Sequence, residues 1–204
     1  VGDCLSPCHR LCPLMLNIPV MLRHIEAKRI DDAIATVRQA LPLAGVLGRL
    51  CHHPCEQGCR RGNWDSPAAI RDMERFVTDQ DFKQTEPHAP SRKPSTGNSV
   101  AIIGAGPAGL AAAYYLSREG HSVTVADRQA QAGGTLRDVA ENQLPGSVLA
   151  AEINLLARLG VDFKFGVELG QQVTLEALGR GFGAVLVTVG ELAKEDGGKL
   201  GLPL

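Results

Sequence analysis

The cysteines of this chain lie in two groups near its start. There are six among 204 residues: Cys4, Cys8 and Cys12 in the first group, and Cys51, Cys55 and Cys59 in the second. Thiolates grouped in threes are soft ligand sets of the kind that iron–sulfur clusters require. The first group ends in Cys-x3-Cys-Pro13, like the bacterial ferredoxin run, whose last cysteine ligates the other cluster in two-cluster ferredoxins. The spacing therefore predicts two clusters that share ligands from both groups.

Grouped cysteines also occur in disulfide frameworks and in zinc sites. Disulfide frameworks are typical of small secreted domains, whereas this chain continues into a pattern typical of a cytosolic nucleotide-binding fold. Structural zinc sites pair their cysteines at two separated knuckles, so groups of three favour a cubane cluster. His9, His52 and His53 lie beside the cysteines, and we interpret them as solvated or supporting groups rather than ligands. Zinc remains the principal alternative at this stage.

The balance of charges argues against nucleic acid as a partner. The chain has 21 Lys and Arg against 22 Asp and Glu, a formal net charge of −1, so it has no basic footprint. No apolar run approaches the ~18–20 residues that cross a bilayer, and no signal peptide is recognisable. We therefore expect a cytoplasmic protein without a membrane partner.

The order of hydrophobic patterns predicts an α+β protein. Residues 1–79 are expected to form an all-α domain that carries the cysteines, residues 80–98 a proline-containing linker, and residues 99–204 an α/β domain. Apolar residues at helical spacing predict helices over residues 18–27 and 31–41.

A third helix is expected to begin at Ser66-Pro67, with serine as the N-cap and proline in the first turn, and to carry Glu74. Farther along, strand and helix patterns alternate, which favours an open parallel sheet. The predicted strands span residues 99–103, 122–126, 161–165 and 184–189, the last of them buried, with a helix over residues 147–159.

A glycine pattern follows the first predicted strand and precedes a helix. It reads Gly104-Ala-Gly106-Pro-Ala-Gly109. In this context the first glycine permits a tight turn, the second lets the backbone approach a pyrophosphate, and the third lets the helix pack on the strand. Asp127 follows the second strand, where an acid can bind a ribose hydroxyl and disfavours a 2′-phosphate. The pattern predicts a Rossmann-like site for FAD or NAD.

The three motifs together resemble a known family. They are Cys8-x3-Cys12-Pro13, Gly48-Arg-Leu-Cys51-His-His-Pro-Cys55-Glu-Gln-Gly-Cys59 and Val100-Ala-Ile-Ile-Gly-Ala-Gly-Pro-Ala-Gly-Leu110. In this order they resemble the small (beta) subunit of NADPH-dependent glutamate synthase, a module also found at the N-terminus of dihydropyrimidine dehydrogenase and in electron-input subunits of related complexes. The resemblance implies an all-α domain with two [4Fe-4S] clusters, followed by part of a glutathione-reductase-type FAD domain.

The resemblance also implies how the ligands are divided. One cluster would be held by Cys12, Cys51, Cys55 and Glu74, and the other by Cys4, Cys8, Cys59 and a cysteine upstream of Cys4. Taken alone, Glu74 would be a solvated helix carboxylate. Because this sequence has no cysteine before Cys4, we expect a fragment that begins just past it, with that cluster incomplete or three-iron.

On the nucleotide side, the resemblance implies a set of FAD contacts. They are Gly104, Gly106, Pro107, Ala108 and Gly109 at the pyrophosphate, Asp127 at the ribose, Arg128, Gly133, Gly134 and Leu136 in the surrounding loop, and Leu169 near the adenine. The family has an arginine in a flavin-side stretch where this chain has Gln143, so contacts there are expected to differ.

The resemblance places an NADPH domain after the point where this sequence ends. No side chain here has the context of a nucleophile or general base, so no catalytic residue is predicted. The expected function is electron transfer between NADPH-reduced FAD and a partner subunit, either a glutamate synthase large subunit or another redox subunit. The alternatives are the input module of a pyrimidine reductase, hydrogenase or formate dehydrogenase, and a zinc-binding scaffold without activity.

Overall fold

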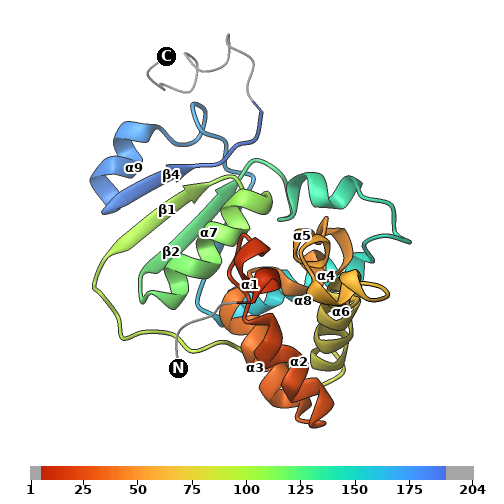
Figure 1. Cartoon of the computed structure of the whole chain (residues 1–204). Coiled ribbons are helices and arrows are strands. Elements are labelled where there is room, and N and C mark those ends of the chain that lie inside the picture. The colour runs from red at the N-terminus through yellow and green to blue at the C-terminus, as the bar shows by residue number, and fades with distance from the viewer. Residues whose placement is uncertain (1–5, 192–204) are drawn as a thin grey trace. The chain divides into compact units, whose positions relative to one another are not determined.

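The computed structural model describes residues 6–191, and the chain divides into two compact units (Figure 1). The first comprises Val1–Pro90 and Glu141–Glu152, and the second comprises Ser91–Ala140 and Ile153–Leu204. The first unit is helical and the second contains a parallel sheet, as the α+β prediction requires. One difference from the expected division is that residues 141–152 belong to the helical unit.

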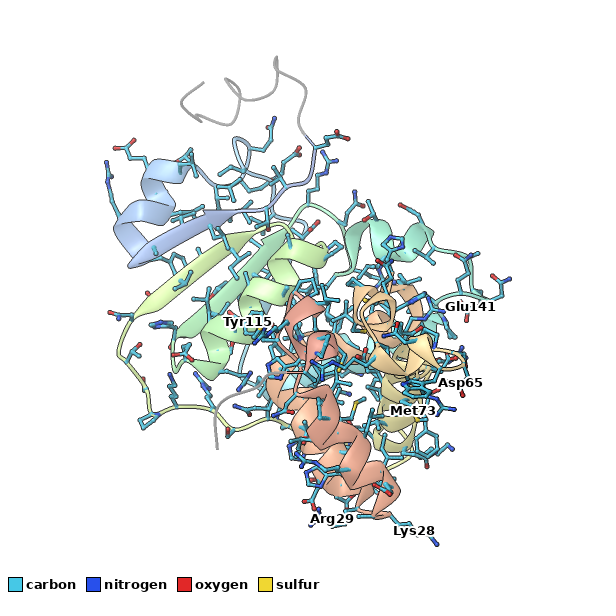
Figure 2. All side chains as sticks on the ribbon, viewed as in Figure 1. Lys28, Arg29, Asp65, Met73, Tyr115 and Glu141 are labelled. Atoms are coloured by element: carbon cyan, nitrogen blue, oxygen red, sulfur yellow. The ribbon has the colours of Figure 1, made fainter. Side chains whose placement is uncertain are left out.

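The helical unit is built from short helices around one apolar core. They are α1 (Pro7–Leu11), α2 (Ile18–Glu26), α3 (Ile30–Ala40), α4 (Ala44–Leu50), α5 (Pro54–Gln57), the 3₁₀ turn η1 (Arg60–Asn63) and α6 (Ile70–Asp81). The two helices predicted over residues 18–27 and 31–41 are confirmed as α2 and α3. Asn17 caps α2, since its side-chain oxygen accepts the Val20 N–H. Lys28 and Arg29 form the exposed tip between α2 and α3 (Figure 2).

The start of α6 differs from the sequence prediction. Ser66 and Pro67 do not begin this helix, which starts at Ile70 and has no capping side chain at its own N-cap. Its first turn is capped from elsewhere, because Glu56 Oε1 accepts the Arg71 N–H at 2.9 Å. A carboxylate from α5 thus satisfies an orphan donor of α6, which a local N-cap rule does not anticipate.

A buried ionic network explains why residues 141–152 join the helical unit. The Arg38 side chain is fully buried and donates from Nε to Asp81 Oδ2 at 2.8 Å and from Nη1 to Glu152 Oε2 at 2.8 Å. Glu152 also accepts the Gly45 N–H. Burial alone would lower the pKa of Arg38, but the two carboxylates outweigh it and raise that pKa.

The second unit contains a four-stranded parallel sheet in the described part of the chain, with the order β3-β2-β1-β4. The strands are β1 (Ser99–Ile103), β2 (Ser122–Asp127), β3 (Asp162–Phe165) and β4 (Ala184–Val187). The connecting elements are α7 (Pro107–Arg118), the 3₁₀ turn η2 (Gly134–Asp138), α8 (Gly146–Arg158) and α9 (Leu175–Gly181). The prediction of a parallel sheet with these strands is confirmed. The last strand is shorter than predicted and half-exposed rather than buried, because it lies at the sheet edge.

Strand β1 is the point at which the order of the sheet reverses. It pairs with β2 on one side and β4 on the other, with Val100 opposite both Val123 and Ala184 (Figure 1). In open parallel sheets, ligands bind beyond the carboxyl ends of the strands at such a switch point. The residues after β1, β2 and β4 are therefore the expected place for a bound ligand. Among the described helices, none combines the length and apolar character needed to span a bilayer.

Candidate functional site

Two glycines of the loop after β1 are required by the packing of the backbone. Gly104 has φ +109°, and a Cβ there would lie 2.3 Å from the Thr188 carbonyl oxygen. A Cβ at Gly109 would lie 1.9 Å from the Gly104 carbonyl oxygen. No side chain fits at either place, so these glycines let the strand, the turn and helix α7 pack closely.

Gly106 has a different role, because it faces open space. It is the N-cap of α7 without a capping side chain, and a Cβ built on it would meet nothing within 4 Å. Opposite it, Gly134 has φ +51°, and its Cβ would lie 2.9 Å from the Gly106 Cα. The Gly133 N–H donates to the Ala105 carbonyl at 2.8 Å. The two glycine loops thus lie against each other and expose backbone N–H groups of a helix start, as a pyrophosphate site requires.

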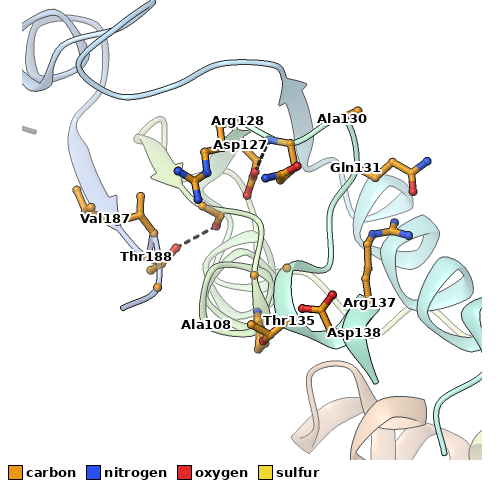
Figure 3. A pocket seen from close by; sticks show the side chains of 17 residues that line it. Ala108, Asp127, Arg128, Ala130, Gln131, Thr135, Arg137, Asp138, Val187 and Thr188 are labelled. Atoms are coloured by element: carbon orange, nitrogen blue, oxygen red, sulfur yellow. Dashed lines mark hydrogen bonds between the residues drawn. The ribbon is translucent and has the colours of Figure 1, made fainter. Parts of the chain in front are cut away.

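Asp127 lies beside this loop at the end of β2 (Figure 3). Its Oδ2 accepts the Ala105 N–H at 2.6 Å, and its Oδ1 accepts the Gln129 N–H at 2.7 Å. These bonds fix the carboxylate next to the glycine turn. An ionised carboxylate has about four lone-pair sites, so this one can still accept a bond from a ribose hydroxyl.

These residues line a cavity of about 880 Å³ at the switch point. Seven predicted contacts belong to its wall, namely Gly104, Gly106, Pro107, Ala108, Asp127, Arg128 and Gly134. Four others do not: Gly109 is in the first turn of α7, Gly133 donates to the Ala105 carbonyl, Leu136 is in η2, and Leu169 is buried with Ile103 and Ala126. The wall thus contains four of the five predicted pyrophosphate residues and the predicted ribose residue, while the residue predicted near the adenine is in a small apolar core.

The sequence prediction missed one residue that follows β4 and one residue within η2. Thr188 lines the cavity, and its hydroxyl lies 2.9 Å from the Gly104 carbonyl and 3.1 Å from the Ile103 carbonyl, to which it donates. Arg137 also lines the cavity (Figure 3), and its Nε donates to the Ala132 carbonyl at 2.6 Å. Thr188 could have been predicted from the sequence, because it lies one residue past a parallel strand, where ligand contacts are expected.

In the helical unit, the second cysteine group and Glu74 lie in one electrostatic neighbourhood. Cys55 is buried, and its pKa is raised to about 12. Burial is the largest cause, followed by the charges of Glu74, Cys12, Glu56 and Cys51. A thiol placed among acids ionises only where a cation compensates, and a metal cluster supplies that positive charge. The donor set therefore fits the group that the sequence predicts here.

Glu74 is not the solvated helix carboxylate that its sequence position suggests in isolation. It is 6 % exposed, on the face of α6 that also carries Ile70 and Val77. Burial, followed by the charge of Glu56, raises the pKa of Glu74 to about 7. A buried ionised carboxylate is costly unless it is paired or binds a metal. Its placement close to Cys55 therefore fits a ligand.

The first cysteine group is described in part. Cys8 and Cys12 pack against the helical core, α1 packs on α5, and the Cys8 Sγ lies 3.1 Å from the Ser6 Oγ. Cys59 is half-buried just before η1, whereas Cys4 lies outside the described residues.

All five described cysteines are free thiols. No group of three or more His, Cys, Asp or Glu side chains in residues 6–191 is arranged for a single metal ion. A [4Fe-4S] cluster is a different geometry, since it holds each ligand on a different iron.

Comparison with known proteins defines the class of both segments. Residues 3–86 match the protein-family model described as dihydropyrimidine dehydrogenase domain II, 4Fe-4S cluster. Residues 102–161 match the NAD(P)-binding Rossmann-like domain. The predicted iron–sulfur segment followed by a Rossmann-like nucleotide-binding segment is confirmed at this level.

Individual relatives extend over both segments. The chain is 40 % identical over 207 residues to the NADP(+)-dependent formate dehydrogenase subunit beta of Moorella thermoacetica, covering 91 % of this chain and 29 % of the relative. It is 40 % identical over 191 residues to the NAD-dependent dihydropyrimidine dehydrogenase subunit PreT of Escherichia coli K12, covering 91 % and 45 %. It is 34 % identical over 188 residues to the NADPH-Fe(3+) oxidoreductase subunit beta of Geobacter sulfurreducens, covering 91 % and 28 %. The chain thus spans less than half the length of these relatives.

Proposed function

We propose that this chain is the iron–sulfur and FAD-binding part of an electron-transfer oxidoreductase subunit. The observation that carries the proposal is the presence of two cofactor-shaped sites in one chain. One is the cavity at the sheet switch point, with open space at Gly106 and Asp127 fixed beside it. The other is the neighbourhood of Cys12, Cys51, Cys55 and Glu74 in the helical unit.

For the nucleotide we favour FAD over a 2′-phosphorylated dinucleotide. The glycine loops would hold the pyrophosphate at the start of α7, and Asp127 would accept from the ribose, where a 2′-phosphate would meet its negative charge. Arg128 and Thr188 would border the bound nucleotide. When bound, FAD supplies hydride acceptance and one-electron transfer, while the protein contributes position and polarity.

For the metal we propose two [4Fe-4S] clusters with interleaved ligands. Cys12, Cys51, Cys55 and Glu74 would hold one cluster, and Cys4, Cys8 and Cys59 would contribute to the other. The backbone N–H of His53 lies 3.4 Å from Cys51 Sγ and donates to it. Hydrogen bonds to ligand sulfurs tune the potentials of such clusters.

The partner is proposed to be another subunit of a redox complex. The formate dehydrogenase and dihydropyrimidine dehydrogenase relatives are named as subunits and are 40 % identical to this chain, which favours an input module for complexes of that kind. A glutamate synthase large subunit is a second candidate partner, supported by the motif resemblance. NADPH would be the donor, bound by a domain outside this sequence.

Elemental and cofactor analysis tests the proposal. After anaerobic purification of the full chain, we expect labile sulfide, FAD and about four to eight irons per chain, with a visible absorption band typical of iron–sulfur proteins. Cys55→Ser should lower the iron content and leave flavin bound, whereas Gly134→Val should lower flavin and leave iron. Stoichiometric zinc without sulfide would instead support the zinc-scaffold alternative and overturn the proposal.

A further inference from the structure

The helical unit contains a second cavity, of about 360 Å³, and the proposed cluster ligand Cys51 lies in its wall beside His52 and His53. Its wall includes Arg49 from α4, Arg71, Asp72 and Arg75 from α6, and the amides of Asn142 and Gln143. Small-molecule pockets usually have mainly apolar walls with few polar groups. This wall instead carries three guanidinium groups against one carboxylate, a composition that suits an anion.

Arg49 supplies a buried donor without a partner. Its side chain is 6 % exposed, and its Nη1 donates to the Gly45 carbonyl at 3.1 Å while Nη2 donates to Asp79 at 2.6 Å. Its Nε has no hydrogen-bond partner among residues 6–191. Buried donors are nearly always satisfied, by water or an ion where the protein offers no acceptor.

Arg71 and Arg75 place two further guanidinium groups at the same cavity. Arg71 Nη1 donates to the Cys51 carbonyl at 3.2 Å, and Arg75 Nε lies 3.6 Å from Asp79 Oδ2. Helices α4 and α6 approach closely here, since a Cβ at Gly48 would lie 2.9 Å from the Arg75 Cα. Each guanidinium has five N–H donors, so both arginines retain donors for a ligand.

The neighbouring carboxylates are largely engaged. Asp79 is shared by Arg49 and Arg75, and Glu56 accepts the Arg71 N–H through Oε1 and lies 3.2 Å from His53 Nδ1 through Oε2. Asp72 is the one carboxylate in the wall itself. Three carboxylates thus balance the three guanidinium groups in charge, and what remains for an anion is the free N–H donors of these groups, Arg49 Nε among them.

We propose that this cavity binds a phosphate group. The three arginines come from two helices and line one space, which matches a tetrahedral oxyanion better than a single planar carboxylate. The cavity is wide enough for a phosphate with a small organic group attached. The source is therefore either free phosphate or a small phosphomonoester.

Calorimetric titration of the anaerobically purified full chain with inorganic phosphate, against chloride at equal ionic strength, tests this site. We expect saturable binding that Arg71→Gln and Arg75→Gln each weaken by about tenfold or more, because each removes a charge-assisted hydrogen bond. Arg29→Gln, at the exposed tip of the helical unit, and Arg128→Gln, at the nucleotide cavity, should retain the wild-type affinity. Circular dichroism checks folding, and either pocket variant suffices if the other misfolds.

Two results would overturn the proposal. One is the absence of phosphate binding beyond that of chloride. The other is binding that Arg128→Gln abolishes while both pocket variants retain it, which would assign the phosphate to the nucleotide cavity. A parallel titration with glycerol phosphate identifies the source: tighter binding than inorganic phosphate indicates a phosphomonoester, and equal or weaker binding indicates the free ion.

Discussion

The glycine loops and the cysteine neighbourhood are both proposed cofactor sites, yet they obtain their shape in different ways. In the nucleotide unit the shape is made by backbone: Gly104 and Gly109 permit contacts that no side chain allows, and Asp127 is held by two backbone N–H groups. In the helical unit the site is made by acidic side chains whose ionised forms would repel one another. Burial and this repulsion raise the pKa values of Cys55 and Glu74.

This difference predicts which site needs its cofactor in order to stay folded. The glycine loops are held by close backbone contacts and bury little charge, so they should keep their conformation without a nucleotide. Buried thiol and carboxyl groups are favourable together only when a cation compensates them, so metal binding and folding should be coupled in the helical unit.

Removal of iron should have the largest effect, and it should be confined to the helical unit. Treatment with a chelator and an oxidant is expected to increase amide hydrogen exchange over α1 to α6 by roughly ten-thousandfold or more, because local opening is no longer opposed by the metal. Exchange over β1, β2 and α7 should change little. Mass spectrometry of peptides from both units measures this, and equal increases in both would break the proposed contrast.

Loss of Arg38 should be the next largest effect. Arg38→Met leaves Asp81 and Glu152 buried without their cation, so we expect the free energy of unfolding to fall by about 3–5 kcal/mol. Arg29→Gln removes an exposed pair with Asp32, 3.6 Å apart, and should cost at most about 0.5 kcal/mol. Urea unfolding of both variants provides the comparison. If Arg38→Met lowered the free energy of unfolding no more than Arg29→Gln does, the Arg38 ion pairs would not be buried in solution.

The nucleotide unit should be most sensitive at its glycine contacts. Gly109→Ala places a Cβ 1.9 Å from the Gly104 carbonyl oxygen, so we expect about 2–3 kcal/mol of destabilisation together with loss of flavin. Gly179→Ala is a matched control in α9, where a Cβ meets nothing within 4 Å and should stabilise by up to about 1 kcal/mol. Thermal unfolding followed by flavin fluorescence distinguishes the two. Retention of flavin by Gly109→Ala would mean that the loop relaxes around the methyl group.

The sequence predicted local features well. The glycine pattern, β1 and the Asp127 position depend on residues close together in the chain, so their spacing was sufficient. The helical spacing of residues 18–27 and 31–41 likewise depends on neighbours within four positions. Resemblance to a family then added Glu74, whose own sequence context favours an exposed carboxylate.

Features that depend on distant residues were missed. Helix α6 begins at Ile70 because Glu56 caps its first turn from α5. Residues 141–152 join the helical unit because Glu152 pairs with Arg38, 114 positions away in the chain. Thr188 reaches Gly104 only after β4 has paired with β1. Periodicity and capping rules describe one element at a time, so they contain no information about such partners.

The raised pKa of Glu74 predicts a pH dependence for the cluster-free protein. Burial lifts this pKa from 4.5 to about 7, so the folded state holds the proton more tightly than the unfolded chain. The stabilisation is fully present below pH 4.5 and is lost as the pH rises through about 7, on the order of 3 kcal/mol in total. Glu74→Gln should remove this slope. Urea unfolding between these pH values tests it, and an unchanged slope in the variant would assign the dependence to another group.

The smallest effect is expected at an exposed pair of the nucleotide unit, where charge affects titration but hardly affects folding. The Lys93 ammonium donates to Glu119 Oε2 at 2.6 Å and lowers the pKa of Glu119. Its stabilising contribution is therefore present above the ordinary glutamate pKa and is lost as the pH falls through the lowered value. Lys93→Gln should return the pKa toward that ordinary value, as should high salt, with no resolvable change in the thermal midpoint. Carbon NMR of the carboxyl group measures the titration, with Lys164→Gln as a control because Lys164 pairs instead with Asp162. A large loss of stability in Lys93→Gln would show that surface charge matters more in this unit than the backbone contacts imply.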